Sequence, residues 1–152
     1  MRSLSCLLLL VCWACVGCRD SQPPPAEEET RSAAELEAEA RLRGNWRERQ
    51  SKRKDPLQAT FGEGTLHLFS EGGFHSSQYS FRLDPSTTPP AIDLVLEELW
   101  EDKYHAKPRT RFHGIYQLDP GRGTLKLYWA EEGRRPREFD PERTHVFERA
   151  QK

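Results

Sequence analysis

The feature that most constrains the fold of this chain is a period-two alternation of apolar and polar residues that begins after Gly44. Alternation of this kind is typical of β-strands that bury one face. Seven segments show it and are predicted to be strands, namely residues 46–52, 65–69, 77–83, 92–96, 111–118, 124–129 and 144–149. Turns rich in Gly, Pro and Asp separate these segments. Many short strands divided by such turns predict an all-β sandwich or barrel.

The clearest pair of strands is GIYQLDPGRGTLKLYWA, residues 114–130. Its five-residue loop, DPGRG, contains the glycines that suit a tight hairpin connection. Side chains two positions apart lie on the same face of a strand. The hairpin therefore has one apolar face, formed by Tyr116, Leu118, Leu125, Leu127 and Trp129. The same rule groups Tyr79 with Phe81 on the apolar face of the segment at residues 77–83.

The cysteines are confined to the N-terminus, since all four lie among the first 18 residues: Cys6, Cys12, Cys15 and Cys18. A disulfide framework would distribute its cysteines through the fold. Here they accompany Arg2 and an apolar run of roughly 14 residues, which is shorter than the ~20 residues that span a bilayer as a helix. Residues 1–17 are therefore predicted to be a secretory signal peptide.

The end of the apolar run, Val16-Gly17-Cys18, resembles the lipobox of bacterial lipoproteins. Small side chains give a peptidase access to the bond before the cysteine, and the thiol then takes a diacylglyceryl group as a thioether. We expect Cys18 to begin the mature chain and to hold it on the lipid bilayer through acyl chains such as palmitate, since two or more chains give stable anchoring. The alternatives are an ordinary signal peptide with an incidental cysteine, and a cut before Cys15, which the bulky Trp13 disfavours.

Residues 18–43 are predicted to link this anchor to the folded domain. Three consecutive prolines and a run of glutamates favour an extended, solvated spacer. A short helix is predicted to follow, because Ser32 and Glu35 match a capping box and strong helix formers come next. We favour a tether that holds the domain away from the membrane over the alternative, a helix that binds a partner.

Six short motifs recur in order after residue 42: Gly44-Asn45-Trp46, Leu83-Asp84-Pro85, Ile92-Asp93-Leu94, Gly114-Ile115-Tyr116-Gln117-Leu118, Thr124-Leu125-Lys126-Leu127 and Arg135-Pro136-Arg137-Glu138-Phe139. This ordered set resembles the lipocalin-like domain family of uncharacterised planctomycete proteins. The resemblance implies a small antiparallel lipocalin-like β-barrel over residues 44–152 and a location outside the cytosol, but no activity. The chain departs from the pattern in the loop Gly121-Arg122-Gly123, which lacks the aspartate that the family has before Thr-Leu-Lys, and in the apolar residues of the segment after Leu94.

An eight-stranded barrel is just wide enough to be filled by its own side chains or to hold one small ligand. We expect a mostly filled interior, with the alternative of a small apolar pocket lined by Tyr79, Phe81, Tyr116 and Trp129. The resemblance implies a structural role for Trp46, which would close the barrel floor. Leu99 and Trp100 lie in a highly charged stretch and are the candidate partner surface, unless they only cover a barrel end.

Composition and motifs argue against several classes of function. The formal net charge is −1, so nucleic-acid binding is not expected. The five histidines lack close metal-ligand spacing, so neither a metal nor another cofactor is expected. No catalytic residues are assigned and an enzyme is not expected. We expect a lipid-anchored protein of the cell membrane or outer membrane, on the extracytoplasmic side, whose non-catalytic barrel binds a small apolar ligand or an envelope protein.

Overall fold

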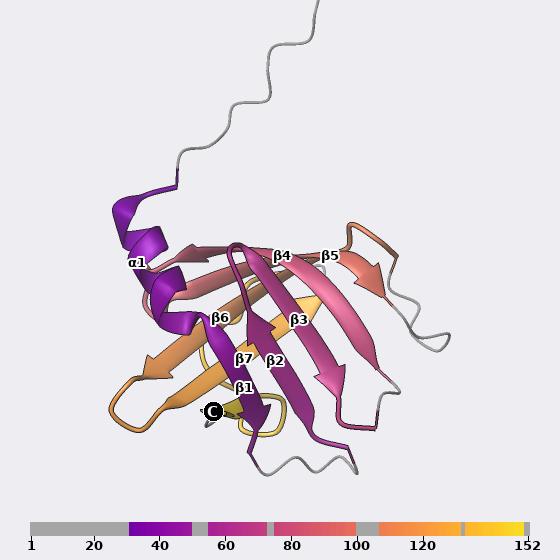
Figure 1. The fold of residues 1–152 in the computed structure, drawn as a ribbon. Coiled ribbons are helices and arrows are strands. Elements are labelled where there is room, and N and C mark those ends of the chain that lie inside the picture. Colours follow the sequence, from indigo (N-terminus) through magenta and orange to yellow (C-terminus); the bar gives the residue numbers. More distant parts are fainter. Residues whose placement is uncertain (1–30, 50–54, 73–74, 100–106, 132, 151–152) are drawn as a thin grey trace, which may run out of the picture. The chain divides into compact units, whose positions relative to one another are not determined.

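The computed structural model describes residues 31–49, 55–72, 75–99, 107–131 and 133–150. They form one short helix and eight strands, shown in Figure 1. The elements are α1 (Ala33–Leu42), β1 (Gly44–Glu48), β2 (Leu57–Phe61), β3 (Thr65–Ser70), β4 (Ser76–Asp84), β5 (Ala91–Leu99), β6 (Arg111–Asp119), β7 (Thr124–Glu131) and β8 (His145–Arg149). The helix begins as predicted, because the Ser32 hydroxyl accepts a hydrogen bond from the Glu35 amide at 3.1 Å.

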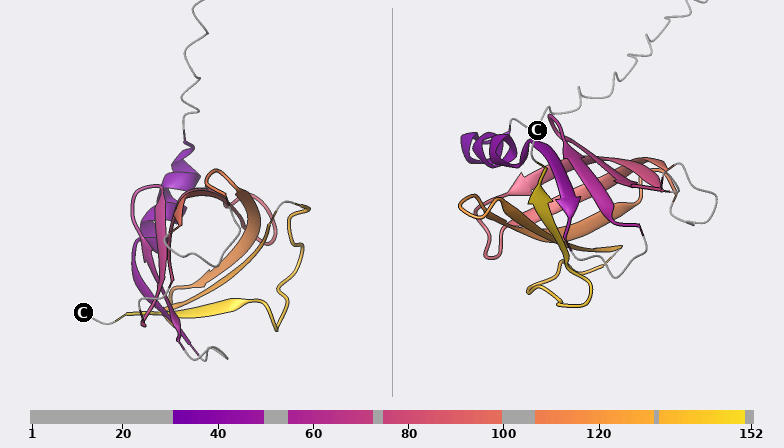
Figure 2. Two further views of the ribbon diagram at one scale, coloured as in Figure 1. Left: turned by 90° about the vertical axis from the view of Figure 1, so that its right-hand side faces the viewer. Right: turned by 60° about the horizontal axis from the view of Figure 1, so that its bottom comes forward.

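Each strand pairs antiparallel with the next along the chain, and β8 pairs with β1 to close a barrel. The left view of Figure 2 shows the strands arranged in a ring. The predicted all-β, lipocalin-like barrel is thus confirmed. Strand β2 was not predicted from the sequence, although its residues alternate between buried and half-buried positions. The strand has only five residues, and its central apolar position is the small Ala59, so its apolar pattern is weak.

The strand register confirms the predicted hairpin. Tyr116 pairs with Leu127 and Leu118 pairs with Leu125, so their side chains share the inner face. At Gly114, which pairs with Trp129, a Cβ atom would lie 2.8 Å from the Tyr128 carbonyl oxygen, so only glycine fits without displacement. The inner faces of all eight strands together form the core, whose largest fully buried side chains include Trp46, Phe61, Leu66, Leu94, Leu125 and Phe147.

The barrel has two distinguishable ends. The helix end is where α1 leads into β1 and where the connections β2–β3, β4–β5 and β6–β7 lie. The far end carries the connections β1–β2, β3–β4, β5–β6 and β7–β8. Within the part of the chain that the structure describes, no helix has the length and apolar character needed to cross a bilayer.

Candidate ligand site on the inner face of the barrel

The four residues proposed to line a pocket all lie on the inner face: Tyr79, Phe81 and Tyr116 belong to the buried hydrophobic core, and the half-buried Trp129 packs against it. Tyr79 meets Phe112 edge-to-face, with ring centroids 5.9 Å apart. Phe81 meets Phe61 in the same way at 5.5 Å. Such edge-to-face pairs are favourable arrangements of aromatic rings. Tyr79 and Phe81 therefore already have aromatic partners within the barrel wall.

Tyr116 and Trp129 lie towards opposite ends of the barrel. Burial raises the pKa of the Tyr116 phenol, the nearby Asp84 carboxylate raises it further, and Arg41 of α1 opposes them. The influence of Asp84 and Arg41 places Tyr116 at the helix end. Trp129 is only half-buried and stacks on His145, with ring centroids 4.7 Å apart. Since β8 begins with His145, this stack lies at the far end.

Direct contacts with α1 close the helix end. The Trp46 indole, predicted to be structural, donates a hydrogen bond to the Leu42 carbonyl at 2.7 Å, and both residues are buried. The guanidinium of Arg149 lies 4.4 Å from the centre of the Trp46 ring. It also donates hydrogen bonds to the carbonyls of Arg41 and Arg43 at 2.7 and 2.9 Å, where the last helical carbonyls would otherwise lack partners.

A buried carboxylate adds to this closure. The Glu39 side chain is 5% exposed and forms an ion pair with Arg31 at 2.6 Å. Its second oxygen accepts a hydrogen bond from the Gly64 amide, in the β2–β3 turn, at 2.9 Å. Glu39 therefore joins the helix to the barrel wall, which explains how a charged side chain is tolerated in a buried position.

The far end has ionisable groups on its inner face. Glu48 follows the phase of the inward-facing Trp46, and His145 follows that of Phe147. The His145 Nδ1 atom lies 2.7 Å from a Glu48 carboxylate oxygen, and the side chains are 19% and 7% exposed. The other Glu48 oxygen accepts a hydrogen bond from the Leu57 amide at 3.1 Å. The pair thus connects β8, β1 and the start of β2.

Two buried serines also face inward at the far end. Ser77 is opposite Leu68 in the β3–β4 register, and Ser70 is opposite the buried Leu57. The Ser70 hydroxyl accepts a hydrogen bond from the His75 amide at 3.2 Å, and the Ser77 hydroxyl lies 3.5 Å from His75 Nε2. The inner face is therefore polar at several positions at the far end, whereas it is aromatic and aliphatic in the middle.

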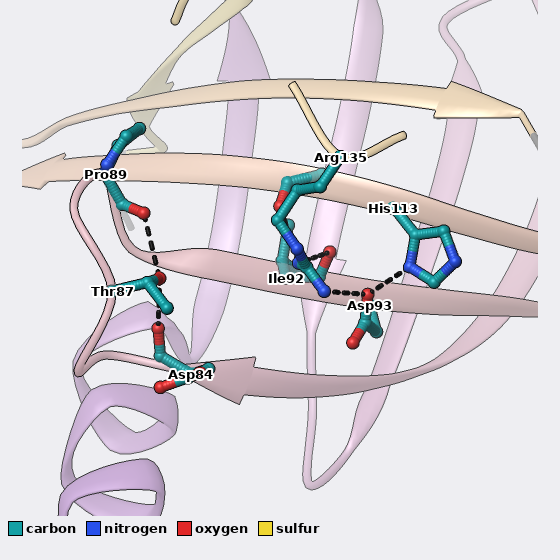
Figure 3. A network of polar contacts seen from close by, with 8 residues as sticks. Asp84, Thr87, Pro89, Ile92, Asp93, His113 and Arg135 are labelled. Atoms are coloured by element: carbon teal, nitrogen blue, oxygen red, sulfur yellow. Dashed lines mark hydrogen bonds and ion pairs between the residues drawn. The ribbon is translucent and has the colours of Figure 1, made fainter. Parts of the chain in front are cut away.

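A second polar network lies on the outer face of the barrel, as Figure 3 shows. The Asp93 carboxylate, on β5, contacts both His113 Nδ1, on β6, and the Arg135 guanidinium at 2.7 Å. Arg135 also donates a hydrogen bond to the Gly114 carbonyl at 3.0 Å. These contacts attach the β7–β8 connection to the barrel wall. Ile115, on the same outer face, is 1% exposed, which agrees with this cover.

The remaining predicted sites are only partly within the described residues. Leu99 is half-buried and packs against the hydrophobic core, opposite Ser77. Trp100, the other half of the predicted partner surface, lies outside the described residues, as does the predicted lipid attachment site, Cys18. Among the described residues, no group of three or more His, Cys, Asp or Glu side chains could hold a metal ion.

The Glu48–His145 pair and the Asp93–His113–Arg135 network were not found from the sequence. The alternation of inward and outward positions along each strand could have indicated the Glu48–His145 pair. Glu48 and His145 both occupy inward positions, where an apolar residue is expected. Two residues that are 97 positions apart become neighbours only when β1 and β8 pair. In comparisons with family models, with curated proteins and with solved structures, nothing matches this chain.

Proposed function

We propose that this chain is a lipoprotein, anchored to the cell membrane or outer membrane through Cys18, whose barrel binds a small, largely apolar molecule in a non-catalytic role. Its resemblance to the planctomycete lipocalin-like domain supports a location outside the cytosol. The anchor rests on the cysteine that ends the apolar N-terminal run. The ligand rests on the inner face of the barrel.

The observation that carries the ligand proposal is the partial exposure of inward-facing side chains at the far end. The Trp129, His145 and Leu99 side chains project from the inner face, yet each is only half-buried. Solvent therefore reaches the inner face at this end, next to apolar groups. Sites for small molecules are typically concave and mostly apolar, with a few polar groups that orient the ligand. The far end has both apolar side chains and a few polar groups on its inner face.

The anchor is tested by intact-mass measurement of the full chain purified natively from membranes. We expect a protein that begins at Cys18 and carries the added mass of a diacylglyceryl group and an amide-linked acyl chain. The matched control is Cys18→Ser, which should stay in the soluble fraction or keep its first 17 residues uncut. An unacylated wild-type chain would contradict the anchor without affecting the ligand proposal.

The ligand is tested on the same preparation by native mass spectrometry followed by release in organic solvent. We expect one small molecule per chain, released on denaturation. A chain that carries no molecule and takes up no apolar fluorescent probe would contradict ligand binding. The alternative function, docking of an envelope protein on Leu99 and Trp100, stays a prediction. Leu99 packs against the hydrophobic core, which leaves less of its side chain for a partner.

A further inference from the structure

The Glu48–His145 pair has a chemical asymmetry that bears on what the far end can bind. A carboxylate oxygen can only accept a hydrogen bond, so the Nδ1 atom of His145, 2.7 Å away, must be the donor. In the neutral ring the second nitrogen, Nε2, then carries a lone pair and is an acceptor. Among the described residues, no hydrogen bond or ion pair uses this Nε2 atom.

The surroundings of His145 hold its ring in one orientation. Trp129 stacks on the ring with an interplanar angle of 16°, and Phe147 lies 6.2 Å from it between centroids. Glu48 is itself fixed by the hydrogen bond from the Leu57 amide. A stack and a carboxylate hold this acceptor atom in place before any ligand binds. Binding a ligand to it therefore costs little additional conformational entropy of the His145 side chain.

The two serines at this end differ from His145. The Ser70 hydroxyl accepts a hydrogen bond from the His75 amide, and the Ser77 hydroxyl lies within 3.5 Å of the His75 ring. The His145 side chain, in contrast, keeps 19% of its surface exposed on the inner face. A ligand that enters at the far end can therefore reach an imidazole acceptor beside the apolar side chains of Trp129 and Leu127.

On the basis of the function proposed above, we propose that His145 is the polar subsite of the barrel and selects a neutral ligand with an apolar body and one hydroxyl or amide N–H donor. The donor binds Nε2, and the apolar body lies against Trp129. An anionic ligand is disfavoured, because its charge would lie near the Glu48 carboxylate. The specificity therefore excludes free fatty-acid anions and favours alcohols, phenols or amides.

The test compares three probes of similar size on the full chain: 2-naphthol, which donates an O–H, 2-methoxynaphthalene, which does not, and the anion 2-naphthoate. Binding is measured by quenching of tryptophan fluorescence. We expect 2-naphthol to bind about three- to tenfold more tightly than 2-methoxynaphthalene, the range expected for one hydrogen bond, and 2-naphthoate to bind most weakly. His145→Phe preserves a ring for the stack on Trp129 but removes the acceptor, so it should bind 2-naphthol and 2-methoxynaphthalene equally.

Because His145→Phe removes the hydrogen bond between His145 and the buried Glu48 carboxylate, the double variant Glu48→Gln/His145→Phe is measured beside it, and circular dichroism reports its folding. The double variant should also lose the preference for 2-naphthol. Three outcomes would overturn the subsite while the barrel remained a ligand-binding domain. The wild type could bind 2-naphthol and 2-methoxynaphthalene equally, or it could bind 2-naphthoate most tightly. The third outcome is a preference for 2-naphthol that survives in the folded variants. If the wild type binds none of the three probes, the proposed ligand function fails and the subsite fails with it.

Discussion

The two ends of the barrel use the same kinds of side chain for different purposes. At the helix end, a tryptophan, an arginine and a glutamate are joined by direct contacts between α1 and the wall: Trp46 to Leu42, Arg149 to Trp46, and Glu39 to Gly64. At the far end, a tryptophan, a histidine and a glutamate also contact one another, but the Trp129 and His145 side chains keep part of their surface exposed.

This difference shows how one small barrel can separate stability from binding. Groups with complete sets of partners contribute mainly to folding, because their removal leaves a cavity or an unpaired polar group. Groups with one unused polar atom and partial exposure contribute less to folding and remain able to bind another molecule. Substitutions at the helix end should therefore lower stability most, whereas those at the far end should alter ligand selection.

The largest expected effect comes from exchanging the two tryptophans for alanine. Trp46→Ala should lower the free energy of unfolding by about 3–5 kcal/mol, because a buried aromatic side chain leaves a cavity. Trp129→Ala should cost about 1–2 kcal/mol, because the side chain is only half-buried. Urea denaturation of both variants measures the difference. Equal losses would remove the distinction between the two ends.

A smaller effect is expected from the glutamates of α1. Glu39→Ala should cost about 1–3 kcal/mol, because the buried Gly64 amide and Arg31 lose their acceptor. Glu37→Ala is the matched control on the same helix, since Glu37 is exposed and pairs with the equally exposed Arg41. The control should cost no more than about 0.5 kcal/mol. If Glu39→Ala leaves the midpoint of thermal unfolding unchanged, α1 does not close the helix end.

The arginine that joins the last strand to the helix should have a still smaller effect. Arg149→Ala should cost about 1 kcal/mol, because two exposed hydrogen bonds to helix carbonyls and the contact with Trp46 are lost. Amide hydrogen exchange should then increase in the last turn of α1. Arg122→Ala, which removes an exposed arginine from the β6–β7 turn, is the control and should leave α1 unchanged.

The smallest effect is a pH dependence at the helix end. The pKa of Tyr116 is raised by burial above its usual 10.0, so the unfolded chain loses this proton at a lower pH than the folded chain. The corresponding stability is complete below about pH 10 and is lost as the pH rises through the folded-state pKa. Unfolding measured between neutral pH and pH 11 should therefore decline less steeply in Tyr116→Phe than in the wild type. Parallel curves would mean that Tyr116 is not held in a buried site.

Much of the barrel could be predicted from local patterns. Alternation over residues 77–83 and in the two strands of the hairpin at residues 114–130 specified which side chains face inward, because side chains on a strand repeat every two residues. The capping pair Ser32 and Glu35 likewise marked the start of α1. The pattern failed at β2, where a small central alanine and only five residues left too little contrast between the two faces.

The candidate site could not be predicted to the same extent, because its contacts join distant parts of the chain. Tyr79, Phe81, Tyr116 and Trp129 were correctly expected to face inward, but barrel curvature and strand register distribute them among different neighbours. Register between strands depends on packing over the whole sheet, which a single strand does not encode.

From the sequence alone, the alternation determined that an all-β domain with an apolar inner face follows Gly44. The sequence also shows that the cysteines are confined to the first 18 residues. Only the tertiary structure decided that the sheet closes by pairing β8 with β1. That closure brings Glu48 to His145 across 97 positions and Arg149 to the end of α1. The physical reason is that alternation is a local property of each strand, whereas closure and the pairing of polar groups depend on the free energy of the complete barrel.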